Sequence, residues 1–486
     1  VPAQDDAAPL PEPAVIEPLG PTIEVLPGAR TVLDLRTCME QALASNDSLL
    51  AERERRAELD GQKLQALATG LPTIDLASDW TRRRDPSFAL DPTFGGGDDA
   101  GFGTVPGADP WFDDWLQGFG SFIPSAEDIP ASTFWTTSVA VNWELNPREI
   151  LGAVGAANLG IERQDLLVDA TEHAVLSGVV EAYYRVIMMA EAVRAVEAQY
   201  ANQDELLEIT RLQFELGTAT RLDTLQAAVG LANIEPTLRR VRRQVANAGA
   251  RLNALLGRDP EAPLSIANES LVETDPIDRE RALELAVSRP DLQASDRFVG
   301  MLERQKQAQS AKRWWPYLTL FGSYGRVGTD FDGQWDDGHE TWTVSAAVNL
   351  PLWNGLLTSG QLHETRAQIR RTEIELRGHR RQAQVVVLEL LNNLSAARRT
   401  LAAAELNLDR AEEARDESLL RYRLGQVDYL SVLDAESNHL TARRTLIEAR
   451  YQVLTLTASL KRAVGHSPAT PLTAIDGLVA APKSRG

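Results

Sequence analysis

The strongest pattern in the sequence is a heptad of apolar positions that occurs in both halves of the chain. The steps alternate between three and four residues, and both halves share one register. The paired positions are Val179, Ala182, Val186, Met189, Val193, Val196 and Tyr200 in the first half, and Val387, Leu390, Leu394, Ala397, Leu401, Ala404 and Leu408 in the second. This spacing is typical of a coiled coil, and its repetition indicates that one helical arm was duplicated.

Each arm ends in a Leu-Gly turn, at 216–217 in the first half and at 424–425 in the second. No proline interrupts residues 148–216 or 356–424, so each stretch predicts one helix on the order of 100 Å long. A second, shorter helix is expected after each turn. Its apolar face would pack beside the long arm.

Short alternating segments before each arm predict two β-hairpins, at 72–146 and 316–353. Alternation gives every strand one apolar and one polar face. The apolar positions are Ile74, Leu76 and Trp80, then Val139, Val141, Trp143 and Leu145, then Leu318, Leu320 and Tyr324, and last Val344, Ala346, Val348 and Leu350. The first hairpin carries a loop at about 81–133 whose length is normal for the exposed rim of a membrane barrel.

The repeats divide the chain into five parts. These are a Pro-rich acidic tail at 1–30, a first repeat at 31–260, a linker at 261–277, a second repeat at 278–468 and a C-terminal tail at 469–486. The N-terminal tail is expected to be disordered or strapped to the surface. Each repeat opens with one helix, for which Asp34 and Asp278 are the expected N-caps. The predicted fold is mostly α-helical with a small β part.

Large aromatic residues fall at both ends of the predicted strands. Trp80, Trp135, Tyr324 and Trp342 lie at the loop ends, and Trp143, Trp314, Trp315 and Trp353 lie at the helix ends. Two such rings around an apolar band are typical of the interfaces of an outer-membrane barrel. A packed soluble core is the alternative, and it leaves the pairing of these positions unexplained.

Two hairpins are too few strands for a barrel, since closure takes about eight. A bilayer makes closure obligatory, because every open sheet edge leaves backbone groups unsatisfied. Three copies supply twelve strands, whereas two copies supply eight but leave the long helices enclosing very little space. We therefore expect a homotrimer embedded in lipid.

The charge balance excludes several classes of partner. The formal net charge is −20 and the isoelectric point is near 4.9, which argues against nucleic acid and against anionic membrane surfaces. Cys38 is the only cysteine, so no intramolecular disulfide is possible. The six histidines are scattered without metal-ligand spacing, and we expect them on the surface. No nucleophile and base stand out, so we expect no metal, no cofactor and no enzymatic activity.

Over residues 31–468 the chain resembles the TolC-like family of outer-membrane efflux channels. The resemblance is carried by the duplicated order of helix, hairpin, helix, turn and helix, and by three segments. These are Pro351-Leu352-Trp353-Asn354-Gly355, then Phe214-Glu215-Leu216-Gly217-Thr218-Ala219-Thr220-Arg221-Leu222-Asp223, and Tyr422-Arg423-Leu424-Gly425-Gln426-Val427-Asp428-Tyr429-Leu430-Ser431.

The resemblance implies a homotrimer that forms a twelve-stranded β-barrel in the outer membrane of a Gram-negative bacterium, continuous with an α-helical tunnel across the periplasm. It implies a periplasmic adaptor that meets the helical tips, and an inner-membrane pump of the RND or ABC type. The implied adaptor contacts are Leu216, Gly217, Thr218, Leu424, Gly425 and Gln426. The two glycines have an equally good structural explanation, because a helix ends readily on a residue that tolerates positive φ.

The resemblance also implies a ring of acidic residues that narrows the periplasmic entrance. Asp434 occupies one such position, but Ser431 stands where a second carboxylate is expected, and Asp428 offers a replacement. Three like charges at a constriction attract cations and repel anions. For Asp223, beyond the first tip, a solvated surface position is the better interpretation.

The function expected from the resemblance is the exit duct of a tripartite pump, which passes small molecules such as drugs and toxic compounds without covalent chemistry. An exit duct for type I polypeptide secretion is the alternative within the same class, and the sequence does not separate the two. A soluble coiled-coil scaffold is the alternative from another class. It predicts a protein that needs no detergent and is a monomer or dimer.

Overall fold

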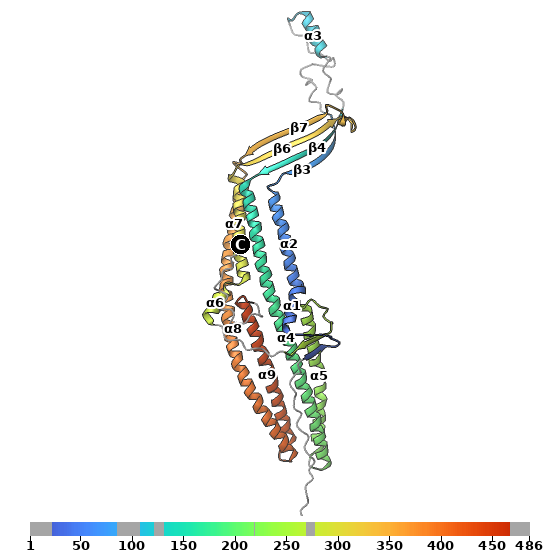
Figure 1. Cartoon of the computed structure of the whole chain (residues 1–486), viewed down its shortest axis with the longest axis vertical. Helices are drawn as coiled ribbons and strands as arrows, with labels where there is room; N and C mark the ends of the chain where they lie inside the picture. The colour runs from blue at the N-terminus through green and yellow to red at the C-terminus, as the bar shows by residue number, and fades with distance from the viewer. Residues whose placement is uncertain (1–21, 85–106, 121–130, 218, 269–277, 467–486) are drawn as a thin grey trace, which may run out of the picture. The chain divides into compact units, whose positions relative to one another are not determined.

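The computed structural model describes residues 22–84, 107–120, 131–217, 219–268 and 278–466 (Figure 1). The chain divides into two compact units. The helical unit holds residues 1–61, 157–302 and 367–486, and the strand unit holds residues 62–156 and 303–366. Four helices contribute residues to both units: α2 (Asp47–Ala68), α4 (Pro147–Glu215), α7 (Pro290–Trp314) and α8 (Leu357–Arg423).

Two helical hairpins make up most of the helical unit (Figure 1). In one, α5 (Arg221–Leu255) follows α4, and in the other α9 (Tyr429–Ala463) follows α8. The long helices agree with the predicted ranges within one residue at each end. Val179, Val186 and Val387 of the apolar heptad are fully buried, because the three-four spacing turns them all toward the neighbouring helices.

A small sheet lies where the sequence analysis expected no strands. β1 (Thr22–Leu26) lies in the predicted tail and β5 (Leu264–Ala267) lies in the predicted linker. β5 is central, antiparallel to β1 and parallel to β2 (Val32–Leu33). β1 buries alternate side chains, Ile23 and Val25, in a core shared with α4 and α5, and β5 is buried over Leu264–Ile266. The Tyr183 hydroxyl donates to the Ala267 carbonyl at 2.6 Å. Strands this short carry too few alternations to be recognised in the sequence.

The helix predicted at the start of each repeat is two helices. α1 (Leu35–Ser45) and α6 (Arg279–Ala286) precede α2 and α7. Their expected N-caps are confirmed, since Asp34 accepts from Thr37 N at 2.7 Å and Asp278 accepts from Arg281 N at 3.2 Å. The break after α1 falls at Asn46, whose buried amide donates to the Leu255 carbonyl at 2.9 Å.

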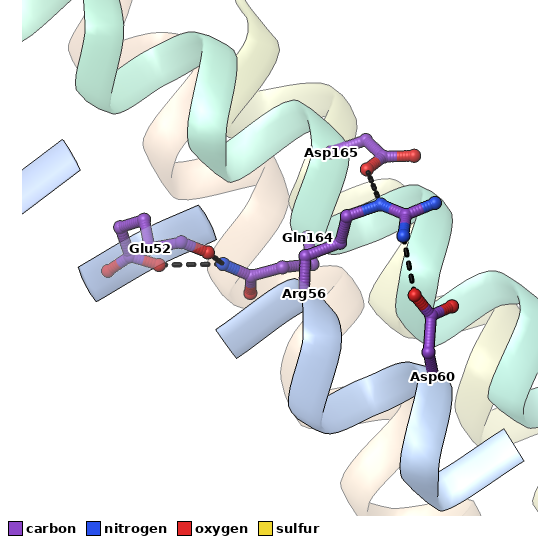
Figure 2. Close-up of polar contacts among 5 residues, drawn as sticks. All are labelled: Glu52, Arg56, Asp60, Gln164 and Asp165. Atoms are coloured by element: carbon purple, nitrogen blue, oxygen red, sulfur yellow. Dashed lines mark hydrogen bonds and ion pairs between the residues drawn. The ribbon is translucent and has the colours of Figure 1, made fainter. Parts of the chain in front are cut away.

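A polar contact joins α2 to α4 within the helical unit (Figure 2). Gln164 is buried and donates to Glu52 twice, to the backbone carbonyl at 3.0 Å and to the carboxylate at 2.7 Å. Beside it Arg56 forms ion pairs with Asp60 at 2.5 Å and Asp165 at 3.0 Å. Exposed ion pairs contribute little, but a buried amide needs its partner. Gln164 therefore fixes the register of α2 on α4.

The strand unit contains one antiparallel sheet in the order β3-β4-β6-β7. Its strands are β3 (Thr73–Arg83), β4 (Ser132–Leu145), β6 (Tyr317–Gly328) and β7 (Glu340–Asn349). β4 pairs with β6, so the two hairpins form one sheet. The predicted apolar positions share one face, and most of them are open to solvent, with Leu76 76% and Val344 77% exposed. Those nearest the helix end of β4 and β6 are half-buried: Trp143, Leu145, Leu318 and Leu320. The structure thus shows a sheet with an uncovered apolar face.

The predicted aromatic positions lie at the two ends of this sheet. At the loop end Trp80 is directly opposite Trp135, and Tyr324 is directly opposite Trp342. At the helix end Trp143 donates its indole N–H to the Gly70 carbonyl at 2.9 Å. Trp314, Trp315 and Trp353 are all exposed. The long loop, predicted without secondary structure, contains a helix, α3 (Pro110–Gly120), which begins at a proline as helices often do.

Gly152 of α4 permits a close approach to α7 in the strand unit. A Cβ at this position would lie 2.9 Å from the Ala308 backbone nitrogen. We expect Gly152→Ala to lower the free energy of unfolding by about 1–3 kcal/mol, since backbone cannot move aside as a flexible side chain can. Circular dichroism during thermal unfolding measures this change.

Gly378→Ala is the matched control, because Gly378 is helical and has no described atom near its added Cβ. It is expected to stabilise the protein by up to about 1 kcal/mol through helix propensity alone. Equal effects of the two substitutions would contradict the packing argument.

Candidate functional site

The candidate site is the end of the helical unit at which both hairpins turn. α4 ends at Glu215 and α8 ends at Arg423, and each is followed by a Leu-Gly pair. Gly217 and Gly425 have φ values of +77° and +71° and no described atom within 4 Å of an added Cβ. The positive φ is therefore what requires glycine here. Leu216 and Leu424 are both exposed, at 71% and 63%.

The two turns restart their second helices with different caps. Thr220 and Asp223 form a capping box, with Thr220 N donating to the Asp223 carboxylate at 2.8 Å and Asp223 N donating to Thr220 Oγ1 at 3.2 Å. In the other turn Asp428 accepts from Ser431 N at 3.0 Å. The hydrogen bonds from Ser431 hold the pKa of Asp428 below its ordinary value, so this carboxylate is charged at neutral pH.

The predicted tip residues therefore have different surroundings. Asp434 and Ser431 are exposed, as is Gln426. Asp223 is partly exposed and takes part in the cap, so its position is compatible with the surface position expected for it. Thr218 lies outside the described residues.

A small core joins the two hairpins just behind the turns. It holds Leu206 and Leu207 of α4, Ala227 of α5, Tyr422 of α8, and Tyr429 and Val432 of α9. The rings of Tyr422 and Tyr429 meet edge to face with their centroids 6.3 Å apart. Residues from both repeats are thus packed together at the tip.

Hydrogen bonds cross this core from the first repeat to the second, and the sequence analysis missed them. Tyr422 OH lies 3.2 Å from Thr210 Oγ1, and Gln203 Nε2 donates to Tyr429 OH at 3.1 Å. Burial raises the pKa of both tyrosines, so both hydroxyls keep their protons. Arg423 forms an ion pair with Glu205 at 2.5 Å. Tyr422 and Tyr429, which flank Gly425, were the only feature of the sequence that could have indicated this polar contact.

A cavity of about 160 Å³, lined by both apolar and charged side chains, lies beside this core. Three helices line it. α4 contributes Asn202, Glu205, Leu206 and Ile209, α8 contributes Arg415, Asp416, Leu419, Leu420 and Arg423, and α9 contributes Glu436. Burial raises the pKa of Glu436, against the opposing effects of Arg415 and a hydrogen bond from Asn202. Carboxylates and cations from both repeats thus share a half-buried seam between the hairpins.

His439 lies one turn further along α9 and is buried, which corrects the expectation of a surface histidine. Its Nδ1 is 3.4 Å from Arg415 Nη1 and its Nε2 is 3.5 Å from the Glu412 carboxylate. Burial lowers the pKa of His439, and Arg415 adds to this effect. The histidine is therefore neutral near pH 7, as its buried position requires.

The described ranges hold neither a metal-binding cluster nor a helix that could span a membrane. Among these residues no group of three or more His, Cys, Asp and Glu side chains is arranged to hold a metal ion. None of the helices there combines the length and the apolar character needed to cross a membrane.

Comparisons with known proteins agree with this architecture. Residues 38–258 and 283–466 match the family described as outer membrane efflux protein. The probable efflux pump outer membrane protein TtgC of Pseudomonas putida is 24% identical over 303 residues, which are 61% of this chain and 61% of the relative. The outer membrane efflux protein BepC of Brucella suis is 24% identical over 73% of this chain and 77% of the relative.

A third relative is named for the secretion of a protein rather than for efflux. The alkaline protease secretion protein AprF of Pseudomonas aeruginosa is 25% identical over 59% of this chain and 60% of its own length. Among solved structures, CusC superposes with a TM-score of 0.73 at 16% identity, covering 93% of this chain and 98% of that chain. VceC from Vibrio cholerae gives 0.70 at 19% identity, covering 89% and 96%.

The fold and its matches define the class of outer-membrane channel proteins. Within that class, the chain belongs to the outer membrane efflux protein family.

Proposed function

We propose that this protein is the exit duct of a tripartite efflux pump, a homotrimer that passes small molecules from the periplasm to the exterior. The uncovered apolar face of the β3-β4-β6-β7 sheet carries this proposal. Both β3 and β7 are open edges, and in a bilayer such edges must be paired. Three copies joined edge to edge give twelve strands and a lipid-facing apolar surface.

The helical tip is proposed as the periplasmic gate and adaptor contact. The exposed Leu216 and Leu424 offer apolar contacts to an adaptor. The Thr210–Tyr422 and Gln203–Tyr429 bonds hold the first repeat against the second, which favours one arrangement of the tip. Opening requires these bonds to break, so they set the resting state of the gate.

Small-molecule efflux is preferred because the relatives TtgC and BepC are named as efflux proteins. Polypeptide secretion is the second candidate, supported by the likeness to AprF. In either case the proposed partners are a periplasmic adaptor and an inner-membrane pump of the RND or ABC type. The soluble scaffold is set aside, since the chain belongs to an outer-membrane family.

The proposed function is tested first by light scattering in detergent and by planar-bilayer conductance. A trimer that conducts ions is expected. A water-soluble monomer would end the proposal.

Asp434 is then tested as part of a charged constriction. Three exposed carboxylates around one axis attract cations, so we expect Asp434→Asn to reduce the cation preference of the channel measurably in reversal-potential recordings. Asp409→Asn, an exposed residue within α8, is the control and should leave the selectivity unchanged. Unchanged conductance and selectivity in Asp434→Asn would show that Asp434 lies outside the constriction.

A further inference from the structure

Two arginine–tryptophan pairs lie in the strand unit at the helix end of the sheet. The Arg148 guanidinium lies over the Trp315 ring at 4.8 Å, and the Arg313 guanidinium lies over the Trp314 ring at 4.7 Å. Arg148 belongs to the first turn of α4, and Arg313 belongs to the last turn of α7. Both rings are exposed, Trp314 at 64% and Trp315 at 47%.

Chain connectivity places both pairs close to the ends of the strands. α4 begins at Pro147 soon after β4 ends at Leu145, and β6 begins at Tyr317 soon after α7 ends. At about 3.3 Å per residue, these gaps are within about 10 Å. Leu151, Leu352 and Leu356 at the same level are also exposed. Exposed apolar side chains therefore lie close along the chain to both pairs.

Neither guanidinium is neutralised within the part of the chain that the structure describes. Arg313 donates to the Ser359 hydroxyl, and Arg148 is exposed without an ion pair among those residues. The neighbouring Lys312, by contrast, is paired with Glu149 at 2.8 Å. An aromatic ring beneath a guanidinium fixes its plane and leaves its N–H edges free. Arg148 thus presents its whole fork to an anion, and Arg313 presents the N–H groups that its bond to Ser359 leaves over.

The position and the chemistry together select the anion. Arginine forks match phosphate oxygens bidentately, and tryptophan is enriched at the level of lipid headgroups. The whole chain is strongly acidic, yet these two cations lie together without carboxylate partners. The two arginines are therefore a local exception to the acidic character of the chain, which argued against anionic membranes.

We propose that Arg148 with Trp315 and Arg313 with Trp314 bind the phosphate groups of anionic phospholipids in the inner leaflet of the outer membrane. The assignment of the leaflet rests on the proposed function, in which the helices extend into the periplasm. Each trimer would carry three copies of both pairs. Bound lipid would hold the helix ends at a fixed depth in the membrane.

The test uses the purified, delipidated trimer in detergent and native mass spectrometry with added phosphatidylglycerol or phosphatidylcholine. We expect the wild type to bind phosphatidylglycerol more tightly, and R148Q/R313Q to bind it about tenfold more weakly than the wild type does. R148K/R313K keeps both charges without the planar fork and is expected to lie between them. R239Q/R371Q is the control, since both arginines are exposed and paired with glutamates within their own helices.

Equal affinity of the wild type and R148Q/R313Q for phosphatidylglycerol would overturn the inference, as would equal affinity of the wild type for both lipids. Loss of the trimer in R148Q/R313Q would overturn it as well, since the arginines would then contact a neighbouring copy of the chain. Planar-bilayer conductance separates the two proposals. A wild type that conducts but binds lipid without preference refutes only the lipid site, whereas a wild type that never inserts refutes the proposed function.

Discussion

Val344→Arg is expected to prevent stable insertion of the protein into the outer membrane. Val344 lies in the middle of the edge strand β7, opposite Gly322, and its side chain is 77% exposed on the apolar face. An arginine at the middle of the lipid-facing surface of a membrane barrel costs about 2–4 kcal/mol. A trimer would carry three such residues, so the cost is incurred three times.

The adjacent residue supplies the control. Thr343 is on the opposite, polar face of the same strand, where it pairs with Ser323. Thr343→Arg adds the same side chain to the face that would line the channel, and insertion is expected to be retained. Density-gradient flotation of outer-membrane vesicles measures the inserted fraction of each variant. An equal loss of insertion in both variants would contradict the proposed barrel, in which one face of the strand contacts lipid and the other contacts water.

The double variant Tyr422→Phe, Tyr429→Phe is expected to open the helical tip. Both rings and their packing remain, but the hydrogen bonds to Thr210 and Gln203 are lost. Each such bond contributes about 1 kcal/mol net. Removing two shifts the balance between closed and open tips by about 30-fold. Single-channel recordings should therefore show a larger mean conductance and longer open periods.

Tyr200→Phe is the control for this pair. Tyr200 lies on α4, the helix that carries the partners Gln203 and Thr210, and its side chain is 38% exposed. It should leave the conductance unchanged. If the double variant also conducts like the wild type while its thermal unfolding is unaltered, the tyrosine bonds do not hold the gate. A fall in the thermal stability of the trimer would instead report damage to the core behind the turns.

The long helices and the strand faces could be predicted because each rests on a repeated pattern. Seven heptad positions per arm leave one consistent helix face, and Val344, Ala346 and Val348 alternate over a whole strand. The small sheet could not be predicted in the same way. β2 has two residues and β5 has four, and their partners are far apart in the sequence. Such pairing depends on tertiary packing rather than on a local period.

The candidate site was predicted only in part, for a related reason. The Leu-Gly turns were visible because a helix end has its own local signature, and both glycines do adopt positive φ. The contacts behind them join α4 to α8 and α9 across the two repeats. Gln203 has no local feature that marks it as the partner of Tyr429. His439 likewise resembles a surface residue until the neighbouring helix is in place.

The direct pairing of β4 with β6 joins the two repeats in one sheet. In the proposed twelve-stranded barrel, a chain with a single repeat would supply only two strands, so six identical copies would be needed. Fusing two repeats halves the number of subunits that must meet. It also allows the two repeats, which occupy equivalent places in the proposed barrel, to differ in sequence. One half of the fused gene can then change its turn, as Thr220 and Asp428 already show in their different caps, while the other half preserves its own.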